Sequence, residues 1–263
     1  MELNTVVHGD CLDVMKSFPD SSVDMVLTSP PYDELRSYNG SLDWGAHIWE
    51  PIIQELFRVL KEGGIVVWIV NDATIKGSET GTSFKQALYF KEVGFNIHDT
   101  MIWNKGGFSA VGALKTRYAP VFEYMFVFAK GNLKTFNPLK DRKNKHGGKL
   151  ASGTIRQVDG SFKPMSKTMI INDYGQRFNI WEQGPQRQRG GHPAPFPETL
   201  VHDHIVSWSN EGDVVLDPFA GSGTVGKVAK DLGRNYILIE KDLGYVNSIT
   251  ERLECPEYVQ LEG

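Results

Sequence analysis

The fold of this chain is decided by the segment Val214-Val-Leu-Asp-Pro-Phe-Ala-Gly-Ser-Gly-Thr224. Its first three residues are apolar and predict a short buried strand, and the pattern over about 225–232 predicts a helix. Gly221 and Gly223 remove side chains from the turn between them, as a close approach of the backbone to a ligand requires. The turn has neither Gly-Lys-Ser/Thr nor G-x-G-x-x-G, which argues against a phosphate-binding P-loop and against a dinucleotide site.

A second strand with a charged end follows this turn. Residues 236–240 are apolar up to Glu240, which lies about 20 residues after the turn. A carboxylate at that position of a nucleotide-binding fold can accept hydrogen bonds from both hydroxyls of a ribose. Taken alone, Glu240 could equally be a solvated acid at a strand end. Helices are expected on either side, over about 245–253 and from Phe196-Pro197-Glu198 to about 207.

The N-terminal half continues the alternation of strands and helices. Apolar runs predict strands over 3–8, 23–27, 65–70, 95–103 and 121–129. Helical spacing predicts helices over 11–18, 47–61 and 82–93, the second of them capped by Gly63-Gly64. This alternation is typical of a doubly wound, mostly parallel α/β sheet, in which ligands bind at the carboxyl ends of the strands. Three segments fall at such ends: Gly9-Asp10, Ser29–Tyr32 and Asp217–Thr224.

The segment Thr28-Ser-Pro-Pro-Tyr32 fits chemistry on an exocyclic amine of a nucleic-acid base. Such an amine is a poor nucleophile because its lone pair is delocalised into the ring. Acceptors that hold the amine hydrogens favour its attack, and the Ser29 side chain and the Pro30 carbonyl could supply them. Pro30 and Pro31 would fix that carbonyl before the reaction begins, and Tyr32 could stack on an extruded base. A Pro-Pro pair alone would more simply indicate a turn.

Charge is unevenly distributed along the 263 residues, whose formal net charge is −4. Residues 134–190 hold twelve Lys or Arg and four Asp or Glu, whereas the remainder holds sixteen basic and twenty-eight acidic residues. A segment of net charge +8 on a body of −12 indicates a localised contact with a polyanion, although a solvated basic loop would look the same. No strand or helix period holds from about 130 to 190, so we expect an insertion there.

The composition of the chain argues against a membrane protein, a secreted protein and a metalloprotein. No apolar run reaches the ~18 residues of a membrane span, and the N-terminus has no secretory pattern, so we expect a cytoplasmic protein without membrane contact. The two cysteines, Cys11 and Cys255, have no neighbouring Cys/His set, so no metal site is expected. Neither cysteine lies beside a base that would activate it as a nucleophile.

Two of these segments together resemble the DNA amino-methyltransferases. Thr28–Tyr32 is similar to their catalytic motif, (D/N/S)PP(Y/F/W), and Phe219-Ala-Gly-Ser-Gly223 is similar to their F-x-G-x-G cofactor motif. The catalytic motif comes first, the basic insertion next and the cofactor motif last, which resembles the permuted β group of these enzymes. The similarity covers about 1–130 and 190–255, including Val7-His-Gly-Asp10, Met101–Lys105 and His192–Pro197.

The resemblance implies S-adenosylmethionine as the cofactor, a mostly parallel seven-stranded sheet with one antiparallel strand, and methyl transfer to a flipped base in double-stranded DNA. It implies that Ser29, Pro30, Pro31 and Tyr32 are catalytic and that Met101–Lys105 helps form the base pocket. Glu240 would bind the ribose and Asp10 the adenine amine. The implied cofactor site comprises Asp10, Cys11, Phe196, Pro197, Asp217, Pro218, Phe219, Ala220, Gly221, Ser222, Gly223, Thr224 and Glu240.

Ser29 bears on the choice of base. Many adenine-specific members have Asp at this position, and serine is commoner among cytosine-N4 enzymes, so cytosine N4 is favoured and adenine N6 is the alternative. The expected organisation is a catalytic half over 1–130, a target-recognition insertion over 131–190 and a cofactor half over 191–263. A homodimer and a cognate restriction endonuclease stay open as partners. The motif order disfavours methylation of RNA or protein, and the intact motifs disfavour an inactive DNA-binding module.

Overall fold

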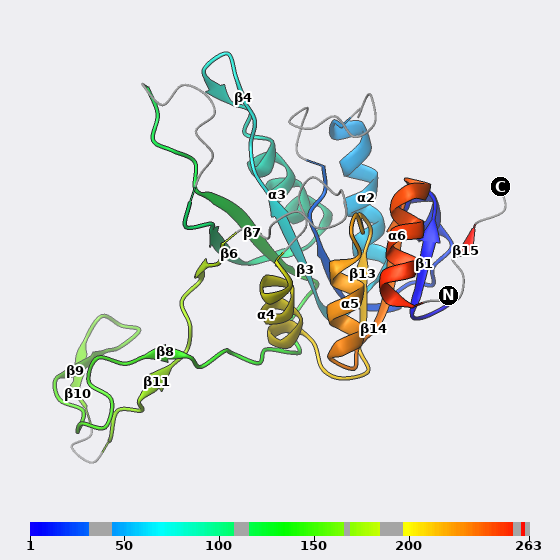
Figure 1. Ribbon diagram of the computed structural model, residues 1–263. Coiled ribbons are helices and arrows are strands. Elements are labelled where there is room, and N and C mark those ends of the chain that lie inside the picture. Colours follow the sequence, from blue (N-terminus) through cyan, green and yellow to red (C-terminus); the bar gives the residue numbers. More distant parts are fainter. Residues whose placement is uncertain (32–43, 108–115, 166–168, 185–196, 255–258, 261–263) are drawn as a thin grey trace. The chain divides into compact units, whose positions relative to one another are not determined.

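The computed structural model describes residues 1–31, 44–107, 116–165, 169–184, 197–254 and 259–260 (Figure 1). The chain divides into two compact units. The larger unit combines Met1–Asn137 with Asn179–Gly263, and the smaller unit is Pro138–Phe178. Among the described residues, no helix has both the length and the apolar character needed to cross a membrane.

A large sheet forms the centre of the larger unit (Figure 1). Its strands are, in spatial order, β12 (Ile180–Glu182), β6 (Asn96–Asn104), β7 (Phe122–Ala129), β3 (Leu60–Val70), β2 (Val23–Thr28), β13 (Val214–Asp217), β14 (Asn235–Glu240), β1 (Thr5–His8) and β15 (Val259–Gln260). Only β7 runs antiparallel to its neighbours in this described sheet. The predicted doubly wound α/β fold is therefore confirmed. The count of seven strands was wrong, because the short strands β12 and β15 extend the two edges.

Helices cover both faces of this sheet (Figure 1). On one face, α2 (Ala46–Val59) packs between α1 (Cys11–Lys16) and α3 (Thr82–Val93). On the other face, α5 (Thr224–Asp231) packs between α4 (Glu198–Trp208) and α6 (Leu243–Leu253). The predicted helices and main strands are thus present, with bounds that differ by a few residues.

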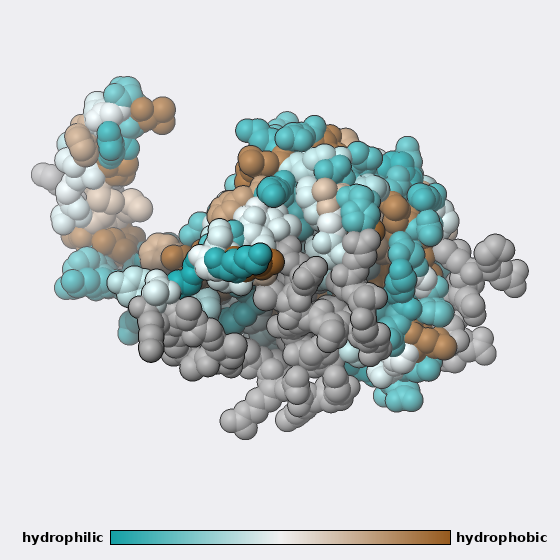
Figure 2. Space-filling model, turned by 90° about the horizontal axis from the view of Figure 1, so that it is seen from above, coloured by the Kyte–Doolittle hydropathy of each residue, from teal (hydrophilic) through white to brown (hydrophobic). Residues whose placement is uncertain are grey.

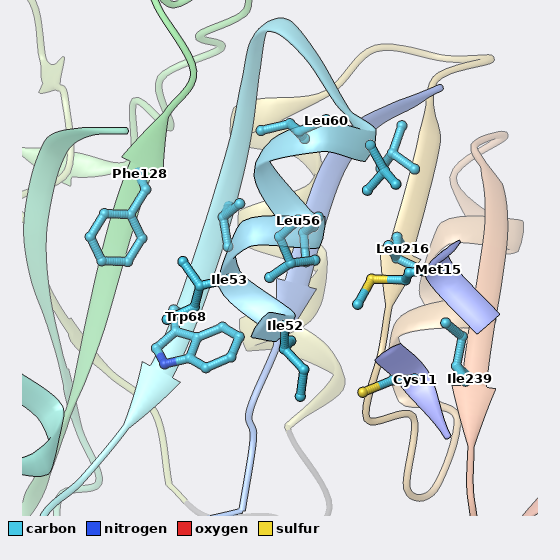
Figure 3. Close-up of a cluster of buried hydrophobic side chains, with 14 of the residues drawn as sticks. Cys11, Met15, Ile52, Ile53, Leu56, Leu60, Trp68, Phe128, Leu216 and Ile239 are labelled. Atoms are coloured by element: carbon cyan, nitrogen blue, oxygen red, sulfur yellow. The ribbon is translucent and has the colours of Figure 1, made fainter. Parts of the chain in front are cut away.

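The core lies between α2 and the middle of the sheet (Figure 3). Ile52, Ile53 and Leu56 recur at helical spacing and form the buried face of α2, which is why this segment is amphipathic. They lie over Trp68 of β3, and α1 adds Met15 to the same cluster. Each such side chain contributes about 1.5–3 kcal/mol when it is removed from water. This packing fixes the strands whose carboxyl ends form the site described below.

The interpretation of Gly63-Gly64 as a helix cap is wrong. Helix α2 ends at Val59, and the chain passes directly into β3 at Leu60. Gly63 has a φ of 81°, and its amide donates a 2.7 Å hydrogen bond to the carbonyl of Lys130. A Cβ on Gly64 would lie 2.7 Å from the carbonyl oxygen of Asp24 in β2. The glycines therefore allow an irregular first part of β3 to run close to its neighbour.

The smaller unit is built from short antiparallel pairs. β9 (Thr154–Arg156) pairs with β10 (Phe162–Pro164), and β8 (Arg142–Lys143) pairs with β11 (Tyr174–Gly175). Arg177 forms an ion pair with Asp141, and its hydrogen bonds lower the pKa of that carboxyl. Among the described residues of this unit, Ala151 is the single buried hydrophobic side chain. The unit thus has ordered local pairing but almost no apolar core of its own.

Candidate active site

The carboxyl ends of the central strands bring the three sequence segments together. Leu216 of β13 pairs with Val26 of β2, and Glu240 of β14 pairs with His8 of β1. Because β2, β13, β14 and β1 are parallel neighbours, the residues that follow them leave the sheet along one edge. The order of the chain reverses between β2 and β13, since β2 leads outward to β3 and β13 leads outward to β14. The catalytic and cofactor segments therefore meet at a topological switch point.

A hydrogen bond joins these two segments inside the protein. The hydroxyl of Thr28, the last residue of β2, donates to Oδ1 of Asp217 at 2.6 Å. The amide of Phe219 donates to the same oxygen at 3.1 Å. Both Thr28 and Asp217 are buried, and burial raises the pKa of Asp217 to about 7 despite these two donors. Asp217 therefore acts within the protein to set the relative position of the two segments.

Ser29, Pro30 and Pro31 follow this anchor at the edge of the sheet. Pro30 is buried, whereas Ser29 and Pro31 are half-buried. A proline has a fixed φ and no amide hydrogen, so two in succession hold the chain out of both helix and strand. Asp217 fixes Thr28, the residue before Ser29, and Pro30 and Pro31 fix the chain after it. The orientation of Ser29 is thus restricted from both neighbours in the sequence. Tyr32 lies outside the described residues.

The other half of the same edge is formed by β3, β6 and β7. Thr28 pairs with Trp68, so β3 extends past β2 at this edge. At the end of β6, Lys105 forms an ion pair with the buried Glu123 of β7 and lies 5.2 Å from the ring centre of Trp103. The indole of Trp103 donates a 2.7 Å hydrogen bond to the carbonyl of Gln183. The segment Met101–Lys105 is therefore held at the same edge of the sheet as Ser29, with β7 and β3 between β6 and β2.

The glycine-containing turn after β13 has little room for side chains. Gly221 and Gly223 have φ angles of 51° and 72°, in the region that favours glycine. A Cβ on Gly223 would lie 2.7 Å from Cγ2 of Ile249 in α6. Helix α5 starts immediately afterwards at Thr224. Bare backbone at the start of a helix suits the close approach of a nucleoside.

Arg252 holds this turn, and its role was not found from the sequence. Its guanidinium donates to the carbonyl of Ser222 at 2.7 Å and to the hydroxyl of Thr224 at 3.2 Å. The same group forms a 2.6 Å ion pair with Glu198 at the start of α4. Arg252 lies about 30 residues after the turn on another helix, so no local pattern marks it. It links α6, the cofactor segment and α4.

Glu240 reaches back to the same turn from the end of β14. One carboxylate oxygen accepts from the amide of Gly221 at 2.8 Å, and the other accepts from the amide of Asp242 at 2.8 Å. Burial raises the pKa of Glu240, and these amides oppose that shift. Each carboxylate oxygen has two lone pairs, so both can still accept a hydroxyl hydrogen. These acceptors fit the two hydroxyls of the ribose of S-adenosylmethionine.

Asp10 and Cys11 occupy the next strand end. Asp10 caps α1 by accepting from the amide of Leu12 at 3.0 Å, and its second oxygen lies 3.2 Å from Nζ of Lys241. The amide of Gly9 donates to the carbonyl of Glu240 at 3.0 Å, which brings this segment beside β14. Cys11 lies in the hydrophobic cluster shown in Figure 3, and burial raises the pKa of its thiol. Cys11 is thus not a reactive thiolate.

Aromatic packing positions the remaining cofactor-segment residues. The ring of Phe219 contacts Trp44 and Trp68 edge-on, at centroid distances of 5.7 and 6.3 Å. Phe219 therefore anchors the turn to the core. Pro197 precedes the first turn of α4, where its carbonyl accepts from the amide of Leu200. Phe196 and the rest of His192–Phe196 lie outside the described residues.

A known protein family matches most of this chain. A family model described as DNA methylase, for N6 and N4 methylation, matches residues 23–251, which include both motifs and all strands from β2 to β14. The chain belongs to the N6/N4 DNA methylase family. It is an enzyme that transfers a methyl group from S-adenosylmethionine to an amino group in DNA, so the predicted activity and cofactor are confirmed.

Two curated relatives of this N6/N4 DNA methylase match nearly its whole length. The orphan methyltransferase M.BamHII of Bacillus amyloliquefaciens is 50% identical over 244 residues, covering 89% of this chain and 90% of that protein. The DNA adenine methyltransferase YhdJ of Escherichia coli K12 is 30% identical over 274 residues, covering 99% and 86%. The similarity thus extends through both sequence motifs.

Two solved structures share the fold of this N6/N4 DNA methylase. One, described as a DNA modification methylase from Thermus thermophilus, was determined in complex with S-adenosyl-L-methionine. It has a TM-score of 0.64 at 24% identity, covering 98% of this chain and 99% of that one. The cytosine-N4-specific PvuII DNA methyltransferase has a TM-score of 0.69 at 21% identity, covering 94% and 85%. These matches confirm the α/β architecture.

Proposed function

We propose that this enzyme methylates N4 of cytosine in double-stranded DNA. The observation that carries the proposal is the serine at position 29, which places a neutral hydroxyl at the head of the catalytic segment. Thr28 links that segment to Asp217 of the cofactor segment, which supports a position of the hydroxyl near the methyl donor. Adenine N6 is the second candidate, and the 30% identity to the adenine methyltransferase YhdJ favours it.

Four residues have separate proposed roles at the target amine. S-adenosylmethionine, when bound, supplies an electrophilic methyl group. Ser29 and the Pro30 carbonyl accept the two amine hydrogens and favour a tetrahedral nitrogen. Pro31 keeps the carbonyl rigid, so little reorganisation is needed as charge develops. Tyr32 stacks on the extruded base. The methylated amine is cationic and strongly acidic, so it releases its extra proton to solvent water without a dedicated general base.

Cofactor binding is proposed for the neighbouring strand ends. Glu240 holds the ribose hydroxyls with the lone pairs that Gly221 and Asp242 leave unused. Asp10 accepts from the adenine amine through a carboxylate whose side chain is 44% exposed. The backbone from Pro218 to Thr224 lines the same site, with Pro197 at its border. Charge-assisted hydrogen bonds of this kind contribute about 1.5–3 kcal/mol each.

The smaller unit, Pro138–Phe178, is proposed to contact the target DNA as the central part of the insertion 131–190. Its sequence contains nine Lys or Arg and three Asp or Glu, a net charge of +6. Figure 2 shows brown apolar residues on its surface between hydrophilic ones, at the left of the view. The large apolar side chains exposed on this unit are Leu150, Ile155, Val158, Phe162, Met169, Ile170, Tyr174 and Phe178. This unit has exposed cationic and apolar side chains and almost no core. Such a surface is suited to become buried when a polyanion such as DNA binds to it.

The choice of base is tested by mass spectrometry of nucleosides from plasmid DNA treated with the enzyme and S-adenosylmethionine. N4-methylcytosine is the expected product, and Ser29→Ala enzyme is the matched control. N6-methyladenine as the sole product would overturn the cytosine assignment and leave DNA methylation intact. Sequencing of the modified positions then gives the recognition site.

The DNA interaction is tested by charge removal within the smaller unit. Lys143, Lys145 and Lys149 are exposed there and are replaced together by Gln. The slope of log Kd against log salt for duplex DNA should become shallower by roughly 0.9 for each phosphate that the variant no longer binds. Lys85→Gln with Lys91→Gln, on exposed positions of α3, is the control. An unchanged slope in the triple variant would remove this unit from the DNA interface.

A further inference from the structure

A small hairpin extends from the same edge of the sheet as the catalytic segment (Figure 1). Its strands, β4 (Thr74–Ile75) and β5 (Ser78–Glu79), follow the end of β3 by only a few residues. β3 is the strand that pairs with Thr28, the residue before Ser29. The hairpin is therefore placed beyond the carboxyl end of a strand adjacent to the catalytic one.

Local contacts make this hairpin rigid. Lys76 and Gly77 have φ angles of 49° and 80°, as a tight two-residue hairpin turn requires. At its base, the carboxylate of Asp72 accepts from the amide and the hydroxyl of Ser83, at 2.9 and 2.6 Å. An isolated two-stranded hairpin is at best marginally stable in water, so these hydrogen bonds are needed to keep it folded.

A further residue braces the hairpin near its turn. The guanidinium of Arg117 donates to the carbonyl of Gly77 and lies 3.4 Å from a carboxylate oxygen of Glu79. The next residue, Tyr118, is fully exposed. The turn is thus fixed in position from the segment that leads into β7.

Packing against the core does not explain why the hairpin is held by these contacts. All six residues of 74–79 are exposed, and the Ile75 side chain is 49% exposed. An apolar residue and a cation, Ile75 and Lys76, stand side by side at the turn. A rigid element that exposes an apolar side chain beside a positive charge is suited to bind a polyanion with stacked apolar rings in its interior. Duplex DNA has this chemistry.

We propose that the hairpin 74–79 is a DNA-contacting element that stabilises the extruded state of the target base. Ile75 enters the base stack beside the vacated position, and Lys76 contacts a flanking phosphate. Extrusion of a base loses stacking on both sides, and an apolar side chain inserted at that step recovers part of it. The inference rests on the proposed function, because it requires a base that leaves a duplex, but it does not depend on whether that base is cytosine or adenine.

The test compares Ile75→Ala with Leu88→Ala on two substrates. Leu88 lies on α3 and is 58% exposed, so it is a matched truncation of an exposed apolar side chain. The substrates are a duplex with the recognition site, located by sequencing modified plasmid DNA, and the same duplex with the target base mismatched. Single-turnover methylation is measured at saturating S-adenosylmethionine. A mismatched base already lacks its pairing and costs less to extrude.

Ile75→Ala should slow methylation of the matched duplex by about tenfold and approach the wild-type rate on the mismatched duplex. Leu88→Ala should match the wild type on both. Equal slowing of Ile75→Ala on both duplexes, or no slowing on the matched one, would overturn the proposal. Failure of the cytosine assignment would be distinguishable, because the product would then be N6-methyladenine while the comparison of Ile75→Ala with the wild type on the two duplexes would still apply.

A second variant tests the interaction with phosphate. Lys76→Gln should reduce the slope of log Kd against log salt by about one, as expected when one phosphate is no longer neutralised. Lys91→Gln on α3 should leave the slope unchanged. An unaltered slope in Lys76→Gln would remove Lys76 from the interface.

Discussion

Thr28 and Asp217 lie 189 positions apart in the sequence and share a buried 2.6 Å hydrogen bond. The hydroxyl of Thr28 ends the strand that carries the catalytic segment, and the carboxyl of Asp217 begins the cofactor segment. The bond therefore couples the positions of the two segments in which we propose that the catalytic and cofactor-binding residues lie. A carboxyl placed this deeply also makes the stability of the protein depend on pH.

Replacement of Asp217 by Asn should remove that pH dependence. Burial raises the pKa of Asp217 from 3.8 to about 7, so between these values the unfolded chain binds fewer protons than the folded one. The free energy of unfolding without cofactor should thus fall as pH rises from about 4 to about 7. Asn keeps an oxygen that can accept from Thr28, so Asp217→Asn should show a smaller fall in urea titrations. Asp231→Asn, at an exposed position of α5, should follow the wild type, and identical profiles for all three would contradict the role of Asp217.

Glu240 should contribute strongly to cofactor affinity. Glu240→Ala removes both acceptors for the ribose and should weaken S-adenosylmethionine binding by about 1–3 kcal/mol in calorimetry. The substitution also frees the amides of Gly221 and Asp242. Glu240→Gln keeps one acceptor oxygen and should bind with intermediate affinity. Unchanged affinity in Glu240→Ala would exclude Glu240 from the site.

Ser29→Ala should reduce turnover much more than cofactor binding. The hydrogen bond from the amine to Ser29 matters most as the nitrogen becomes tetrahedral, so its loss raises the barrier and leaves the ground state nearly unchanged. Single-turnover rates and calorimetric Kd values separate the two effects. Ser248→Ala on α6 is the control. A wild-type single-turnover rate in Ser29→Ala would refute the assigned role.

Cys11→Ala should retain methyl transfer at saturating cofactor. The thiol is buried in the core, and burial together with the charge of Asp10 raises its pKa, so it is not a thiolate at neutral pH. Thermal unfolding monitors folding, and the single-turnover rate monitors chemistry. Loss of transfer in a variant that folds and binds S-adenosylmethionine would mean that the cysteine acts covalently.

Gly223→Ala and Gly212→Ala form a matched pair. Both glycines have positive φ angles, 72° and 83°, so alanine costs roughly 1–2 kcal/mol of backbone strain at either site. At Gly223 the new Cβ would also meet Ile249 at 2.7 Å, whereas at Gly212 it would meet nothing within 4 Å. Gly223→Ala should therefore lose more stability and also weaken S-adenosylmethionine binding. Equal unfolding free energies for the two variants would show that α6 yields to the added methyl.

The sequence was most informative where a local pattern determines structure. Val214–Leu216 predicted β13, and the glycines after it predicted a turn at a ligand site, because both depend on neighbouring residues. Gly63-Gly64 was misread because a glycine pair after a helix is also compatible with a strand that passes close to another. Arg252 was missed because its partners, Ser222 and Glu198, come together only in the folded chain.

The strand β12 could not be foreseen for a related reason. The strand Ile180–Glu182 is only three residues long, and the residues around it are rich in Gly, Asn and Gln. It forms because β6 offers an edge, to which Ile180 pairs at Ile102. A property of the neighbouring strand, rather than of the segment itself, decides its structure.

The place of β13 in the sheet has a consequence for synthesis on the ribosome. β2 and β3 emerge early, but the neighbour on the other side of β2 is β13, almost 190 residues later. Until β13 arrives, the nascent chain exposes the backbone edge of Val23–Thr28, a run of mostly apolar residues that can pair with other chains. Chaperones should therefore engage this strand during translation, and chains that stop before residue 214 should aggregate rather than remain as half-active enzymes.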